Sequence, residues 1–389
     1  MKTHRLVNRF KAAFLMMMIA MSTLLSNTAS AKETPCETPP PVKEQTIMLA
    51  LLLDTSNSMD GLIDQAKSQL WKIVNELAAA KCSDGTRPNI KISLYEYGNN
   101  RLSEETGYIR QVSALTTDLD VISEKLFSLT TSGGDEYCGH VIQTSLSQLA
   151  WSASEADLKM IFIAGNEPFN QGGVSFHKAC GIARDKDVVV NTIFCGDFNE
   201  GLRTEWKNGA DITGGTYMSI EQNTKTVYVP TPFDEKIEAM NDRLNDTYVY
   251  YGKSGVAKKD LQSAQDRNAQ SYGQSNKVER AVSKSSHAYQ NSSWDLVDAM
   301  KENEKAVTEA ADSDLPKQMQ GMNAQQRKDY VAKKSAERKK IQEEIQSLNV
   351  KRQEYIAANT PKESMESTLD GALIKAIKVR AKTKNMVWK

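Results

Sequence analysis

The sequence predicts a doubly wound α/β fold with a mainly parallel sheet, followed by an α-helical C-terminal region. Continuous apolar runs of strand length, such as residues 46–53 and 158–164, alternate with segments of helical periodicity such as 61–80. Runs that are apolar on both faces are typical of central strands in a parallel sheet that helices cover on both sides. Strand signals vanish after Gly252, where Ser, Gln, Asn, Lys and Ala become frequent.

Taken in order, the pattern before residue 252 predicts six strands and five helices. The strands cover residues 46–53, 90–97, 108–112, 158–164, 188–195 and 216–220. The helices cover residues 61–80, 118–129, 141–150, 174–183 and 233–244, with Asp118 or Thr117 as the cap of the second. Strands that alternate with helices in this way favour a parallel sheet with helices on both faces.

Beyond residue 252 the sequence predicts helices and looser segments. Residues 294–311 favour one helix and residues 324–358 a longer one. The longer segment carries a coiled-coil-like apolar stripe, which basic residues on the same seam shorten. The stripe consists of Ile341, Ile345, Leu348 and Tyr355, and the basic residues are Lys334, Arg338 and Arg352. We therefore expect a helical hairpin packed against a neighbour, with a free coiled coil as the alternative.

The first residues have the pattern of a secretory signal peptide. Basic residues precede an apolar stretch at 12–25, and small residues follow up to Ala31. We expect cleavage near Ala31 and an exported chain, periplasmic or secreted, with no transmembrane segment in its mature part. The expected division is a signal peptide at 1–31, an extended proline-containing leader at 32–45, an α/β domain at 46–252 and the helical region at 253–389.

Charge is distributed unevenly, although the formal net charge of the whole chain is +0. Residues 32–252 hold 19 Lys and Arg against 31 Asp and Glu, whereas residues 253–389 hold 26 against 18, so the nets are −12 and +8. The two halves are expected to attract each other or different partners. The basic tail at 375–389 suits an anionic membrane surface, the acidic α/β domain or plain solvent. No nucleic-acid partner is expected.

All five cysteines follow the signal peptide, where an oxidising compartment permits disulfides. We expect Cys36 to pair with Cys82 and Cys180 with Cys195, which leaves Cys138 near the site described next. A competing interpretation is a zinc centre, because Cys138-x-His140 and His177-x-x-Cys180 have zinc-like spacing.

The run from Asp54 to Ser58 reads Asp-Thr-Ser-Asn-Ser and directly follows an apolar strand. One carboxylate and two hydroxyls offer hard oxygen ligands, which suit Mg²⁺, Mn²⁺ or Ca²⁺. Two further loops are residues 130–136, before the predicted helix at 141–150, and residues 165–168, after the predicted strand at 158–164. Because ligand sites of open parallel sheets form at the carboxyl ends of the strands, we expect the three loops to meet there.

With this motif and this order of strands, the segment from about residue 46 to residue 250 resembles the von Willebrand factor A (VWA) domain. The metal-ion-dependent adhesion site of that family begins with Asp-x-Ser-x-Ser. The resemblance implies that Ser56 and Ser58 bind the metal directly and that Asp54 binds through water or orients the site. The sequence departs from the family at the other ligands: Asp135 stands where a Thr is usual, with Thr131 as a nearby substitute, and Asn166 or Glu167 replaces the usual Asp.

The resemblance implies a metal-dependent protein-binding module of the cell envelope, with a protein partner. Two carboxylates, Asp54 and Asp135, near the ion would neutralise it and weaken its attraction for a carboxylate of that partner. The alternatives are a metal-free envelope scaffold that binds through its basic helices, and a zinc hydrolase. We expect no enzyme, because neither a Gly-x-Ser-x-Gly elbow nor a phosphate-binding Gly-Lys-Ser loop is present.

Overall fold

The structure is a computed structural model that describes residues 45–223, 228–359 and 368–388. The predicted signal peptide at 1–31 and the leader up to residue 44, with Cys36, lie outside the described residues. Eight strands are described: β1 (Thr46–Asp54), β2 (Ala80–Lys81), β3 (Asn89–Tyr97), β4 (Ile109–Thr116), β5 (Leu158–Gly165), β6 (Val189–Cys195), β7 (Tyr217–Ile220) and β8 (Val387–Trp388).

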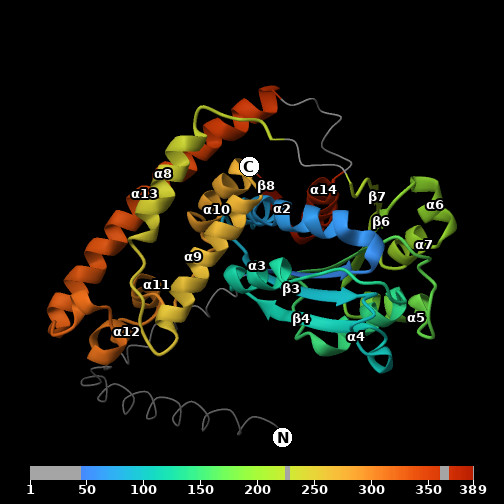
Figure 1. Ribbon diagram of the computed structural model, residues 1–389, viewed down its shortest axis with the longest axis horizontal. Coiled ribbons are helices and arrows are strands. Elements are labelled where there is room, and N and C mark those ends of the chain that lie inside the picture. The colour runs from blue at the N-terminus through green and yellow to red at the C-terminus, as the bar shows by residue number, and fades with distance from the viewer. Residues whose placement is uncertain (1–44, 224–227, 360–367, 389) are drawn as a thin grey trace, which may run out of the picture. The chain divides into compact units, whose positions relative to one another are not determined.

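Six of these strands form one sheet in the order β4-β3-β1-β5-β6-β7. Only β4 runs antiparallel to its neighbour, and the other pairs are parallel. The predicted doubly wound α/β fold is therefore confirmed (Figure 1). Strand β1 lies in the middle, and all of its residues after Thr46 are buried, as its continuous apolar run predicts.

Helices cover both faces of the sheet. On one face lie α2 (Asp60–Ala78), α3 (Leu119–Phe127) and α14 (Leu369–Ala381); on the other lie α4 (Cys138–Gln148), α5 (Phe176–Asp185) and α7 (Trp206–Asp211). Figure 1 shows α2 and α14 on the side opposite α4 and α5. Successive residues of β1 point to opposite faces of the sheet. Leu49 and Leu51 pack in the cluster that contains α2, whereas Ala50 and Leu52 pack in the cluster that contains α4.

The remaining helices belong mostly to the segment after β7. They are α6 (Phe198–Arg203), α8 (Asp234–Asn245), α9 (Gly255–Ser271), α10 (Gln274–Lys284), α11 (Leu296–Glu302), α12 (Lys305–Thr308) and α13 (Ala324–Asn359). Short 3-10 turns lie at η1 (Asn57–Met59), η2 (Glu104–Thr106), η3 (Asp312–Asp314), η4 (Lys317–Met319) and η6 (Lys382–Lys384). None of the described helices is long and apolar enough to cross a membrane.

Helix α14 belongs to the core of the α/β sheet, although it follows the long helical segment. Leu369, Leu373 and Ile377 join the hydrophobic cluster that contains Leu49 of β1. Strand β8 then pairs antiparallel with β2, which directly follows α2. The change of composition near residue 252 is therefore not a boundary of the core.

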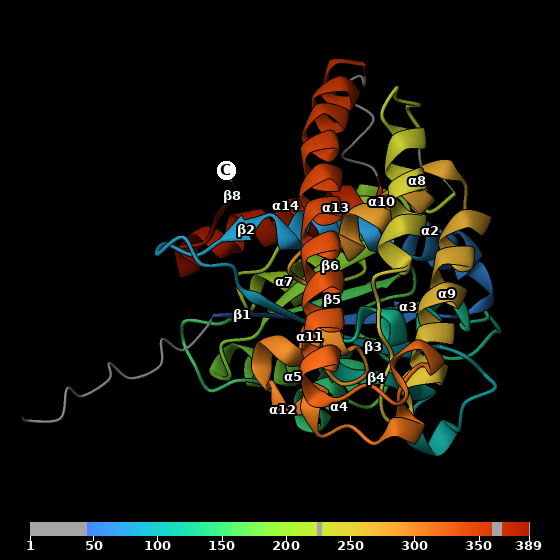
Figure 2. The same cartoon turned by 90° about the vertical axis from the view of Figure 1, so that its left-hand side faces the viewer.

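Helix α13 packs against α8 and α10 along the stripe expected from the sequence, and Figure 2 shows it from the side. Ile341 and Ile345 are buried in the core, but Tyr355 is 39% exposed. The two arginines on the seam are also buried, because each meets carboxylates. Arg338 contacts Asp295 at 2.6 Å, and Arg352 contacts Glu279 at 2.6 Å. These basic residues thus take part in the packing of α13.

Of the two expected disulfides, the Cys36–Cys82 pair cannot be compared with the structure, because Cys36 lies outside the described residues. The expected Cys180–Cys195 disulfide is wrong: both residues are free, buried thiols. The physical reason is the sheet itself. Cys180 on α5 packs in the cluster on one face, whereas Cys195 at the end of β6 packs in the cluster on the other.

Candidate metal site

Three strand ends bring the candidate site together. Asp54 of β1 lies opposite Tyr97 of β3, and Leu53 lies opposite Ala164 of β5. The loops that follow these strands therefore emerge side by side. Two backbone hydrogen bonds fix the loop after β1. The Thr55 N–H donates to the Tyr97 carbonyl at 2.9 Å, and the Ser132 N–H, from the loop after α3, donates to the Thr55 carbonyl at 2.9 Å.

The loop after β1 presents three of the predicted ligands together. Asp54 is fully buried, and its Oδ1 accepts a hydrogen bond from the Ser56 N–H at 2.7 Å. The hydroxyls of Ser56 and Ser58 lie 3.3 Å apart. Asn166, from the loop after β5, donates from Nδ2 to the Ser58 hydroxyl at 3.1 Å. The oxygens of Asp54, Ser56, Ser58 and Asn166 thus lie close together.

Glu136 is the second carboxylate of this cluster, and the sequence interpretation missed it. Its side chain is only 5% exposed, and its carboxyl group interacts with the carboxyl of Asp54 and the hydroxyl of Ser56. Asp54 Oδ2 and Glu136 Oε2 are both buried without a hydrogen-bond partner among the described residues. The two carboxyl groups therefore interact directly with each other, and each keeps one buried oxygen whose partner is not among the described residues.

Burial sets the protonation of both acids. Desolvation raises the pKa of Asp54 and of Glu136, and for Glu136 the neighbouring Asp54 charge is the next cause. Glu167 adds a smaller repulsive effect on the pKa of each. The site is therefore poor in compensating positive charge.

Two glycines leave the space in which these acids meet. Gly98 has a φ of +78°, and a Cβ at this position would come within 2.7 Å of Glu136 Cγ and 2.8 Å of Asp54 Oδ1. At Gly165, a Cβ would lie 2.5 Å from the Tyr97 hydroxyl and 3.1 Å from Asp54 Oδ2. Only a residue without a side chain fits at either position.

The other predicted ligands lie outside the cluster. Asp135 is exposed and accepts a hydrogen bond from the Tyr137 hydroxyl at 2.9 Å. Thr131 donates to Asp60 in the first turn of α2. Glu167 is exposed at the rim, where it accepts from Gln171 at 3.2 Å. Asp135 and Glu136 are neighbours in the chain, yet Asp135 is exposed whereas Glu136 is buried.

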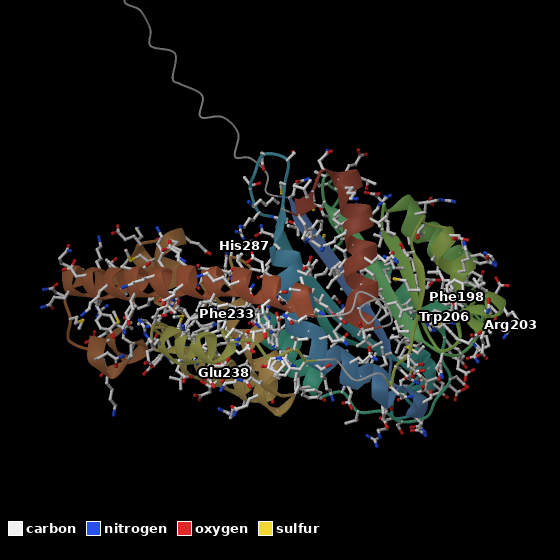
Figure 3. All side chains as sticks on the ribbon, turned by 90° about the horizontal axis from the view of Figure 1, so that it is seen from above. Phe198, Arg203, Trp206, Phe233, Glu238 and His287 are labelled. Carbon is white, nitrogen blue, oxygen red and sulfur yellow. The ribbon has the colours of Figure 1, made fainter. Side chains whose placement is uncertain are left out.

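The rim of the site is held in place by residues of other elements. Asn100 N–H donates to the Gly133 carbonyl at 2.9 Å, and the Ser132 hydroxyl donates to Asn100 Oδ1 at 2.7 Å. On the opposite side, Trp206 Nε1 of α7 donates to the Glu167 carbonyl at 2.8 Å; Figure 3 labels this tryptophan. Both flanking loops are therefore fixed by directional contacts.

The donor set fits a hard divalent cation. Two carboxylate oxygens that lack a partner among the described residues lie with the buried Ser56 hydroxyl and the exposed Ser58 hydroxyl, and a cation would compensate the negative charge of the two acids. Asp54, Glu136, Ser56 and Ser58 are the side chains that would hold it.

The zinc interpretation has no such support in the described part of the chain, where no three His, Cys, Asp or Glu residues form a metal-binding group. Cys138 and Cys180 are buried in the core, and the exposed His177 ring stacks on Phe176 with centroids 4.0 Å apart.

The comparisons with known proteins found similarity only to solved structures. No family model matches the chain, and no curated protein matches it. Among solved structures, BatB from Bacteroides thetaiotaomicron is 16% identical, with a TM-score of 0.34 over 45% of this chain and 90% of that one. The SpRpn10 VWA domain is 16% identical, with a TM-score of 0.33 over 45% and 88%. Proximal thread matrix protein 1 from the mussel byssus, with a zinc-occupied MIDAS motif, is 15% identical, with a TM-score of 0.35 over 45% and 42%.

Proposed function

We propose that this chain is an exported protein-binding module of the cell envelope whose binding loops depend on a divalent cation, Mg²⁺ by preference, with Mn²⁺ and Ca²⁺ as alternatives. The observation that carries the proposal is the cluster of the buried Asp54, Glu136 and Ser56 with Ser58 at its exposed side, in which two carboxylate oxygens lack a partner among the described residues. Its place at the carboxyl ends of parallel strands is the usual position of ligand sites in such folds.

The cation would supply positive charge that holds the loops after β1, α3 and β5 in one arrangement. The chain's own residues prepare for this. Asp54 is fixed by the Ser56 N–H, Ser58 is fixed by Asn166, and the 129–137 segment is anchored to Thr55 and Asn100. An ordered rim of this kind suits recognition of a folded partner, because little conformational entropy is lost on binding.

An exposed apolar pair lies beside the same edge of the sheet. Phe198 is 49% exposed and Leu202 36% exposed, one turn apart on α6, which follows the carboxyl end of β6. The Phe198 ring lies 5.0 Å from that of Tyr217, and Figure 3 labels Phe198. Aromatic residues are enriched in the core of protein–protein interfaces. We therefore include α6 in the proposed binding surface.

The alternative, a metal-free scaffold that binds through basic helices, finds less support. Several basic residues of the helical region are engaged within the protein. Arg280, Arg338 and Arg352 are buried in ion pairs, and Arg380 and Lys384 both contact Asp187. We also propose no catalytic role for the candidate site.

Metal binding to the full chain tests the proposal. Calorimetry after removal of metal with a chelator should show binding of Mg²⁺ or Mn²⁺ to the wild type and its loss in Asp54→Ala. Capture of a protein from envelope extract should then depend on the metal and be lost both with chelator and in Asp54→Ala. No binding of any divalent ion would instead support the metal-free scaffold. Zinc binding that Cys138→Ala abolishes would support the hydrolase alternative.

A further inference from the structure

The fold pairs its buried acids with basic side chains almost everywhere except at the candidate site. Glu96 pairs with Arg110, Asp120 with Arg280 at 2.7 Å, and Asp370 with Lys72 at 2.5 Å. The remaining buried acids in such pairs are Asp234, Glu279, Asp295 and Asp298. Asp157 meets a backbone N–H instead.

Asp54 and Glu136 differ from all of these acids. Among the described residues, neither forms an ion pair with a basic side chain, and each keeps one buried oxygen without a partner. Both are more than nine-tenths buried and their carboxyl groups interact directly, so the two groups repel each other whenever both are ionised. A buried like-charged pair of this kind is costly unless a cation or a proton lies between its members.

We propose that Glu136 is a metal ligand supplied by the chain itself, so that the bound cation is enclosed by two internal carboxylates. This inference rests on the metal site of the proposed function. Glu136 contacts the same Ser56 hydroxyl that belongs to the Asp54 loop, and the absence of a side chain at Gly98 provides the room for its Cγ. The 129–137 loop that carries it is anchored on both sides of the cluster.

The charge balance determines what such a site attracts. When ionised, Asp54 and Glu136 together carry two negative charges, which balance the two positive charges of a divalent cation. The filled site is then neutral, and the exposed Glu167 at its rim adds negative charge. An incoming carboxylate gains little from such an ion and meets repulsion at the rim. The cation therefore orders the loops, and the partner binds without giving a carboxylate to the metal.

The neighbouring acids Glu136 and Asp135 provide a matched test. Calorimetric titration of the chelator-treated full chain with Mn²⁺ should show that Glu136→Gln weakens affinity at least about tenfold. Asp135→Asn, the exposed neighbour, should leave the affinity within about twofold, a change below 0.5 kcal/mol by the usual conversion. A wild type that binds no Mn²⁺ would refute the proposed function itself. A wild type that binds Mn²⁺ with Glu136→Gln unaffected would overturn this inference alone.

Chemical rescue provides a second readout that a folding defect does not produce. Glu136→Ala removes the carboxylate and leaves space, so acetate should restore part of the Mn²⁺ affinity of this variant. Acetate should leave the wild-type affinity unchanged, because the internal carboxylate already holds that position. Acetate that strengthens Mn²⁺ binding to the wild type as much as to Glu136→Ala would contradict an enclosed site.

Discussion

Asp54 and Glu136 are two buried acids in direct contact, and this arrangement affects stability as well as the proposed metal binding. In the absence of metal, the site opposes folding whenever both acids are ionised. The sequence predicts that Asp54, Ser56 and Ser58 lie together, because three oxygen donors on one turn form a local pattern, and the structure brings them together. It does not identify Glu136, because the direction of each side chain in the 129–137 loop depends on anchors contributed by Thr55 and Asn100.

Glu136→Gln should stabilise the metal-free protein, and the gain should grow with pH. The pKa of Glu136 is raised from 4.5 to about 9, chiefly by burial, so the folded state binds a proton that the unfolded state releases between these values. The stability of the wild type should therefore fall as pH rises through this window. We expect Glu136→Gln to be more stable at pH 8 by about 1–3 kcal/mol.

Urea unfolding with chelator at pH 5 and pH 8 would measure this difference. The wild type and the variant should differ less at pH 5, where the carboxyl group keeps more of its protons. An equal difference at both pH values would show that the charge of Glu136 is not the cause.

Gly98→Ala should disturb the contact between Asp54 and Glu136, because the added methyl group has no room there. The added Cβ would meet Glu136 Cγ at 2.7 Å on a backbone with positive φ. Backbone strain and overpacking together should lower the unfolding free energy by about 2–4 kcal/mol. Mn²⁺ binding should weaken as well.

Gly85→Ala is the matched control for this change. Gly85 also has a positive φ, +84°, but nothing lies within 4 Å of an added Cβ. It should show only the backbone cost of about 1 kcal/mol, with unchanged Mn²⁺ affinity. Equal losses in the two variants would mean that the space at Gly98 is unimportant.

Helix α13 depends on buried charge as much as on its apolar stripe. The sequence predicts its extent well, because residues 324–358 have a continuous helical pattern. The basic residues on the seam suggested an interruption, since a pattern of residue types does not reveal partners more than 40 positions away. Arg338 in fact meets Asp295 and the Thr247 carbonyl, and its guanidinium lies 4.0 Å from the centre of the Tyr248 ring.

Arg338→Met should therefore be strongly destabilising. The substitution keeps much of the side-chain volume but leaves Asp295 buried with its main cation removed. Loss of one partner of a buried ion pair costs about 3–5 kcal/mol. Chemical unfolding followed by circular dichroism would measure the loss.

The next residue along the helix serves as the control. Lys339 has a side chain that is 78% exposed and lies 3.9 Å from Glu343. Lys339→Met should change stability by no more than about 0.5 kcal/mol. If the two variants proved equally stable, the buried ion pair would not be what holds α13.

The described chain from residue 45 onward shares one principal core. Its largest hydrophobic cluster runs from Ile47 to Met386 and includes residues of α8, α10, α13 and α14. The sequence predicted the central strands, because each is a local apolar run. It did not predict that α14 returns to the sheet, because the apolar residues of a helix do not reveal which distant surface the helix will cover.

Leu373→Ala should consequently weaken the whole unit. Leu373 is 1% exposed and packs in α14 against the sheet. The substitution should cost about 2–4 kcal/mol through lost burial and the cavity left behind. Tryptophan fluorescence and far-ultraviolet circular dichroism should report the same shifted midpoint, because the sheet and helices lose structure together.

Val379→Ala on the same helix is the comparison. Val379 is 60% exposed, so the unfolding free energy should change by no more than about 0.5 kcal/mol. Separate transitions for the two probes in Leu373→Ala would indicate that the helical segment folds independently of the sheet.

The return of α14 to the main sheet and the pairing of β8 with β2 also bear on the order of events during biosynthesis. A ribosome that has made residues 46–252 has delivered every strand of the main sheet, yet the face beneath α14 stays uncovered until residues 369–388 follow. Translation of more than a hundred further residues separates the two moments. Until those last residues are made, the nascent chain lacks a helix that covers part of one face of its sheet.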